Sequence, residues 1–230
     1  MSLIEKIEIA GSCFHNMMRT VIESYRLEQT GFLIGQMSNN KAVLYNAYPI
    51  TTSKRKPSSV YYGDEKAIER LKRYEIAVSL KEGEISLLGG YHSHIVKKED
   101  KNTERRSELN ELSDDDLDYI REDMRSIGAV SWIEIILRLE EKAYSSRDVG
   151  LYLTHHKKKM GLTIMDFPLN HINGRNGYRI VLSGYLIEKR PEITLKNWHD
   201  NKTQDLKKIR RMMKTTELRL KERKIKIIEK

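Results

Sequence analysis

Two histidines at the end of one predicted strand are the residues of this chain that point most directly to chemistry. Residues 89–94 read Gly-Gly-Tyr-His-Ser-His and end an apolar run that is typical of a strand. Side chains of a strand alternate between its two faces, so His92 and His94 project to the same side, about 6.6 to 6.8 Å apart along the backbone. Imidazoles at this spacing can bind one metal ion, which then needs a third ligand and a base.

An acid-rich turn at residues 113–116, Ser-Asp-Asp-Asp, offers a third ligand at the start of the next predicted helix. Ser113 would be the N-cap, and Asp116 the third helical residue, with its carboxylate at the helix N-terminus. Ser-x-x-Asp is also a capping-box pattern, which explains both residues without a metal. The local sequence leaves both interpretations open.

Glu28 lies where the first predicted helix ends and the Gly-flanked apolar strand Gly-Phe-Leu-Ile-Gly begins. A solvated residue at a helix end would explain a glutamate here. It is also a third candidate piece of the metal constellation, upstream of the histidines and of the acid-rich turn. Its position alone does not separate these two interpretations.

Taken in order, these residues form a set that resembles the pattern of the JAMM/MPN-plus zinc metalloprotease family. The family pattern is Glu, then His-(Ser/Thr)-His, then Ser-x-x-Asp, matched here by Glu28, His92, His94, Ser113 and Asp116. The resemblance covers about residues 1–190. It implies a cytidine-deaminase-like α/β/α sandwich built around a mixed β-sheet, that is, an α+β domain.

The resemblance also implies a role for each residue. His92, His94 and Asp116 would bind Zn²⁺ and leave the fourth position to water, as in catalytic zinc sites. Glu28 would take a proton from that water and pass it to the leaving amine. Ser113 would donate a hydrogen bond to the oxyanion. The implied substrate is an amide bond at the C-terminus of ubiquitin or a ubiquitin-like protein, in a conjugate or a precursor.

Two departures from the family pattern lie just after the histidines. Ile95 stands where the family usually has proline, and the family spacing would place the acid at Arg105, which cannot bind zinc. Using Asp116 requires an insertion of about eleven residues within 95–112, and such length changes cost little in a surface loop. The insertion is either a lid or substrate-binding element, or a plain solvated loop. The alternative third ligands are Asp100, Asp114 and Asp115.

The elements that would position these residues follow from hydrophobic periodicity. Their order predicts an α+β domain with a mixed or mostly antiparallel sheet rather than a doubly wound one. The predicted strands are 4–11, 31–36, 42–50, 60–62, 85–95, 131–139, 149–154, 162–165 and 178–187, the predicted helices are 12–28, 64–79 and one from 113, and 51–59 is a predicted polar loop.

Residues 191–230 are predicted to form a basic helical extension of the 1–190 domain. They hold 13 Lys and Arg against 6 Asp and Glu, or +7 of the chain's net charge of +9. Their apolar residues step by three and four, a heptad-like seam that favours packing on the body, on a second copy or on a partner protein. A basic tail can also attract nucleic acid, although the chain has no base-reading motif.

Composition limits the remaining possibilities. No stretch approaches the roughly 18 to 20 apolar residues of a membrane span, and the N-terminus has no basic region typical of a signal peptide. Cys13 is the one cysteine, which excludes an internal disulfide and favours the cytoplasm. The sequence therefore predicts a cytoplasmic zinc-dependent metallopeptidase or isopeptidase. The alternative is a catalytically silent MPN-type scaffold or interaction subunit.

Overall fold

A computed structural model gives the arrangement of the chain. It describes residues 4, 6–25, 27–38, 41–50, 54–56, 59–61, 66, 69–70, 73–74, 85–96, 109–143, 163–168, 176–188, 214–215 and 217–221.

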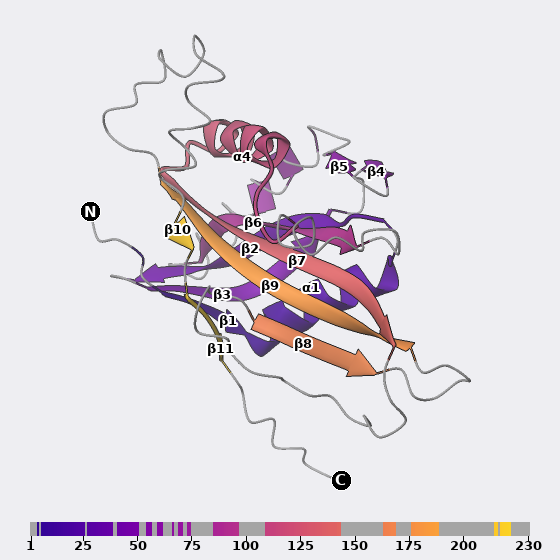
Figure 1. Cartoon of the computed structure of the whole chain (residues 1–230). Helices are drawn as coiled ribbons and strands as arrows, with labels where there is room; N and C mark the ends of the chain where they lie inside the picture. The colour runs from indigo at the N-terminus through magenta and orange to yellow at the C-terminus, as the bar shows by residue number, and fades with distance from the viewer. Residues whose placement is uncertain are drawn as a thin grey trace.

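A nine-stranded mixed sheet forms the centre of the fold (Figure 1). Its order is β10-β9-β7-β6-β2-β3-β1-β11, with β8 also paired to β9. A separate hairpin is formed by β4 and β5. The elements are β1 (Lys6–Ala10), α1 (Gly11–Glu23), β2 (Thr30–Ser38), β3 (Lys41–Pro49), β4 (Lys54–Lys56), β5 (Ser59–Tyr61), β6 (Ser86–Val96), α4 (Asp114–Ser126), β7 (Ser131–Ala143), β8 (Thr163–Pro168), β9 (Asn176–Glu188), β10 (Lys214–Thr215) and β11 (Glu217–Lys221).

The pairing directions make the sheet mixed, as the order of elements predicts. Strand β6 runs parallel to β7, and β1 runs parallel to both β3 and β11. The other pairs, including β2 with β6 and β7 with β9, are antiparallel. An α+β fold with a mixed sheet is thereby confirmed.

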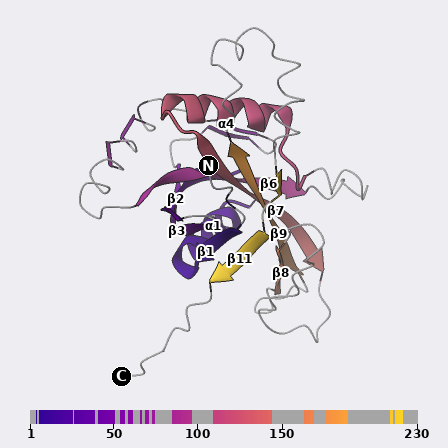
Figure 2. The same ribbon diagram turned by 90° about the vertical axis from the view of Figure 1, so that its left-hand side faces the viewer.

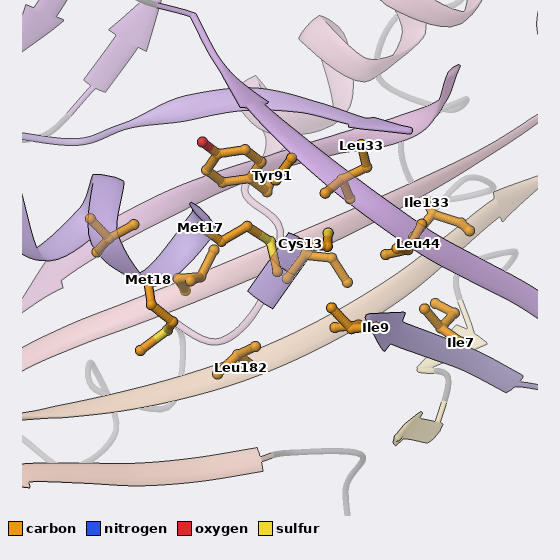
Figure 3. Close-up of a cluster of buried hydrophobic side chains, with 14 of the residues drawn as sticks. Ile7, Ile9, Cys13, Met17, Met18, Leu33, Leu44, Tyr91, Ile133 and Leu182 are labelled. Carbon is orange, nitrogen blue, oxygen red and sulfur yellow. The ribbon is translucent and has the colours of Figure 1, made fainter. Parts of the chain in front are cut away.

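The two described helices pack against opposite faces of this sheet (Figure 2). Alternation along β7 shows the division: Ile133 and Ile135 pack with α1, whereas Trp132 and Ile136 pack with α4. Figure 3 shows the α1 side, where Met17 lies among apolar side chains of the sheet. Each face of the sheet thus has its own apolar core. Among the described residues, no helix is long and apolar enough to cross a membrane.

The prediction of a helix through residues 191–230 is wrong where the structure describes that segment. Strand β10 pairs with β9, and β11 adds to the sheet beside β1. Leu218 and Leu220 alternate with polar residues and stand in register with Ile7 and Ile9. This period-two pattern lets β11 satisfy backbone groups of β1 that would otherwise form an open sheet edge.

Other expectations differ in smaller ways. The predicted polar loop 51–59 contains β4, which pairs with β5. The predicted strand 149–154, most of the predicted helix 64–79 and the rest of the C-terminal extension lie outside the described residues. Residues 97–108 of the expected insertion also lie outside the described residues. On either side of them, β6 continues to Val96, and Leu112 is buried in the core with α4.

Candidate metal centre

The central strand β6 carries both histidines on the sheet face that packs against α4. His92 stands beside Ile136 of β7, and His94 stands beside Arg138. Both imidazoles are buried, and their Nε2 atoms are 3.1 Å apart. The strand alternation inferred from the sequence is therefore confirmed, and it brings the two rings together.

The first turn of α4 brings Asp116 to the same point. Ser113 is the N-cap: its Oγ accepts a hydrogen bond from the Asp116 backbone N–H at 3.1 Å, while its own N–H donates to Asp116 Oδ2 at 2.8 Å. The Asp116 carboxylate also lies 3.6 Å (Oδ1) from His92 Nε2 and 3.7 Å (Oδ2) from His94 Nε2. The capping box and the approach to the histidines, which the sequence presents as alternatives, occur together.

Hydrogen bonds at the other ring nitrogens determine which histidine atoms face this point. His92 Nδ1 lies 2.7 Å from Glu134 Oε1, and His94 Nδ1 lies 2.8 Å from the Leu109 carbonyl oxygen. A carboxylate or a carbonyl can only accept, so each Nδ1 carries the hydrogen. In the neutral rings each Nε2 is then a lone-pair donor, as a metal ligand must be.

Side-chain atoms of three residues that can each bind a metal ion therefore converge at this point. The ligand atoms of His92, His94 and Asp116 lie within 4.8 Å of one another. Ligands of a tetrahedral zinc ion are separated by about 3.3 to 3.6 Å, which follows from zinc–ligand bonds of about 2.0 to 2.2 Å. The two Nε2 atoms are 3.1 Å apart, and each lies 3.6 or 3.7 Å from a different oxygen of the Asp116 carboxylate, Oδ1 for His92 and Oδ2 for His94. The group could hold a metal ion.

The charges around the site favour a cation at this point. Burial by itself would lower the pKa of His92, but the negative charges of Asp116, Glu134 and Glu28 outweigh it and raise the pKa to about 9. Burial would likewise raise the pKa of Asp116, yet His92 and His94 hold it well below its ordinary value. Either a proton or a metal ion can supply the positive charge that these acceptors require.

Glu28 is delivered to the site by the start of β2. Thr30 pairs with His92, and the next step of the ladder joins Gln29 to Ser93: Ser93 N–H donates to the Gln29 carbonyl, and Gln29 N–H donates to Ser93 Oγ, both at 2.8 Å. Glu28 directly precedes Gln29, is half-buried, and contributes to the raised pKa of His92. The middle residue of His-Ser-His thus fastens the segment that bears the predicted base.

Ser113 lies beside the ligands, but its hydroxyl is engaged. Ser113 Oγ donates to Asp116 Oδ2 at 2.6 Å, so it would have to give up this bond to stabilise an oxyanion. Asp114 and Asp115 are exposed in the same turn and do not belong to the ligand group, whereas Asp100 lies outside the described residues. Of the acids of this turn, only Asp116 approaches the histidines.

The sequence reasoning missed Glu134, which holds His92 in place. Glu134 is 4% exposed and lies in β7 within the run Trp-Ile-Glu-Ile-Ile. A charged residue in the middle of an apolar central strand signals a buried partner, because an unpaired buried charge is very costly. That signal was available in the sequence, although the identity of the partner was not.

No protein-family model and no curated protein sequence matches the chain. Among solved structures, the chain is similar to the solution structure of protein DSY2949 from Desulfitobacterium hafniense, with 15% sequence identity, 94% of each chain covered and a TM-score of 0.46. A likeness at this level adds nothing to the assignment of fold or function.

Proposed function

We propose that this protein is a zinc-dependent metallopeptidase or isopeptidase of the JAMM/MPN-plus type. The observation that carries the proposal is the convergence of His92 Nε2, His94 Nε2 and the Asp116 carboxylate, with both histidine tautomers set for metal binding. Three protein ligands leave one position of a tetrahedral ion open, as in catalytic rather than structural zinc sites.

The protein groups around the proposed ion match the needs of amide hydrolysis. A bound Zn²⁺ would supply Lewis acidity, which makes water a nucleophile near neutral pH and polarises a carbonyl. Glu28, half-buried two residues before β2, is the proposed general base, which would take a proton from water and deliver it to the leaving amine. Ser113 is the proposed oxyanion donor once its hydroxyl turns from Asp116.

The substrate class rests on the sequence resemblance. The ordered set of Glu28, His-Ser-His and Ser-x-x-Asp supports cleavage of an amide bond at the C-terminus of ubiquitin or a ubiquitin-like modifier. Deconjugation from a lysine and trimming of a precursor are the two reactions that this specificity allows. The fold that we propose with this function is the MPN-type α/β/α sandwich.

The test joins metal content to cleavage. Protein prepared with excess zinc and then desalted should hold about one zinc ion per chain, and His92→Ala should hold almost none. Wild type should cleave a fluorogenic amide at the C-terminus of a ubiquitin-like protein, while Glu28→Gln should keep its zinc and lose about 100-fold or more in kcat. Glu23→Gln makes the same change at an exposed glutamate of α1 and should behave as wild type.

Each failure has a separate meaning. Equal and low zinc content in wild type and His92→Ala would refute the metal site. Stoichiometric zinc with equal cleavage by wild type and Glu28→Gln would refute the assigned base. Stoichiometric zinc without cleavage of any ubiquitin-like substrate would favour the scaffold alternative.

A further inference from the structure

A buried hydrogen-bonded chain runs from β7 to the candidate metal centre. Trp132 Nε1–H donates to Glu134 Oε2 at 2.7 Å, and His92 Nδ1–H donates to Glu134 Oε1 at 2.7 Å. Trp132 is fully buried, and Glu134 is 4% exposed. Each carboxylate oxygen therefore receives one strong donor, and His92 receives its orientation from a group that water hardly reaches.

The neighbouring strand leaves room for this carboxylate. Gly90 of β6 stands in register with Glu134. A Cβ added at Gly90 would lie 3.0 Å from Glu134 Oε2 and 3.2 Å from Trp132 Cζ2. Any side chain at position 90 would thus press on both groups. Trp132, His92 and Gly90 together fix the position of the Glu134 carboxylate.

We propose that Glu134 is a positioning residue for the metal centre, which keeps the hydrogen of His92 on Nδ1 and directs its Nε2 lone pair to the ion. The inference rests on the proposed function, since it assumes that His92 binds a metal. Glu134 itself lies on the far side of the imidazole from the ligand group of His92, His94 and Asp116. Carboxylates in this position raise the basicity of the histidine ligand and fix its tautomer.

The substitution Glu134→Gln exposes this role because an amide has only one acceptor oxygen. The Trp132 indole is a donor and has no other form, so the amide oxygen is expected to stay with it. The amide N–H₂ then faces His92 Nδ1 and favours the tautomer with the hydrogen on Nε2. That hydrogen occupies the lone pair that the metal needs. Glu134→Gln should therefore weaken metal binding without changing any ligand.

The experiment measures the Kd for Zn²⁺ by competition with a chromophoric chelator, on the full chain. Glu134→Gln should bind zinc about 10- to 100-fold more weakly than wild type. The control Glu141→Gln makes the same change on the opposite face of β7, where Glu141 accepts from the Tyr25 hydroxyl. It should bind zinc like wild type.

A double variant separates tautomer control from a general loss of structure. In Glu134→Gln/Trp132→Phe the indole donor is gone, so the amide can turn its oxygen to His92 Nδ1. Zinc affinity should then be tighter than in Glu134→Gln alone, although a second core side chain has been changed. A purely structural role predicts that the double variant is worse than the single one.

A measurement on wild type keeps the proposal testable if the variants do not fold. In ¹⁵N NMR of the zinc-loaded protein, His92 Nδ1 should carry the hydrogen and Nε2 should show the shift of a metal ligand. Coordination through Nδ1, or equal zinc affinity of folded Glu134→Gln and wild type, would overturn the proposal and leave the metal site standing. Absence of zinc binding by wild type would overturn the proposed function as well.

Discussion

Replacing Ser113 by alanine tests whether one residue both caps α4 and serves the site. The change removes two hydrogen bonds: the Asp116 N–H to Ser113 Oγ, at 3.1 Å, and the Ser113 hydroxyl to Asp116 Oδ2, at 2.6 Å. The bond from Ser113 N–H to Asp116 Oδ2 is a backbone contact and can persist. Loss of an N-cap hydroxyl costs about 1 kcal/mol.

The second bond adds less than its length suggests. Ser113 is exposed, so water can replace the hydroxyl as a donor to Asp116. We therefore expect the free energy of unfolding of the metal-free protein to fall by about 1 to 2 kcal/mol in total. For a domain of this size, that corresponds to a decrease in Tm of about 2 to 8 °C.

The assay is urea denaturation with a chelator present, for wild type, Ser113→Ala and Ser113→Thr. Threonine retains an N-cap hydroxyl and should restore most of the stability. If Ser113→Ala is as stable as wild type, the hydroxyl does not cap α4 and the reasoning is refuted. Cleavage by the zinc-loaded proteins then tests the second role, since loss of an oxyanion donor lowers kcat by about 100- to 1000-fold, more than a lost cap explains.

Three further predictions concern the surroundings of the site. Because the pKa of His92 is raised to about 9, the protonated imidazole stabilises the metal-free native state; this contribution is complete below about pH 6.5 and is lost as the pH rises through about 9. Urea denaturation across this pH range measures the effect, and an unfolding free energy that does not change with pH would contradict it. Tyr185→Phe removes the hydrogen bond to the carbonyl of Asn110, which follows Leu109, the residue whose carbonyl accepts from His94. The change should lower the unfolding free energy by about 1 kcal/mol and weaken zinc binding. The control Tyr45→Phe, on the exposed surface, should change neither quantity. A chain that ends before β10 should expose the edge of β1 and lower Tm, seen by calorimetry; an unchanged Tm would show that β11 contributes nothing to the sheet.

The parts of the site that the sequence could predict depend on local rules. The period of two along β6 places His92 and His94 on one face, and the Ser-x-x-Asp pattern sets the N-cap of α4 at Ser113. Both rules act within a few residues, so no knowledge of the fold is needed. The length of the segment between β6 and α4 does not affect them, because the capping box involves only residues at the start of the helix.

The parts that could not be predicted depend on pairing between distant strands. Glu134 lies 42 residues from His92, and only the parallel register of β6 and β7 brings the two together. In the C-terminal segment the steps of three and four residues favoured a helix, but Leu218 and Leu220 also alternate. Pairing with the edge of β1 favours the strand, and the sequence of the C-terminal segment does not reveal that this edge is available.

The buried Glu134 in β7 indicates that stability alone does not account for the residues of this strand. Replacing a buried ion pair by well-packed apolar residues is often neutral or stabilising, by about 1 to 4 kcal/mol. On its face of β7 Glu134 lies between Trp132 and Ile136, both buried, so an isoleucine or leucine would suit its position in the strand. Yet Gly90 leaves the space beside it open, and Trp132 and His92 both donate to it. A core arranged around a carboxylate in this way makes sense where the imidazole that it holds has a task at Nε2, and the binding of a metal ion is the task that we propose.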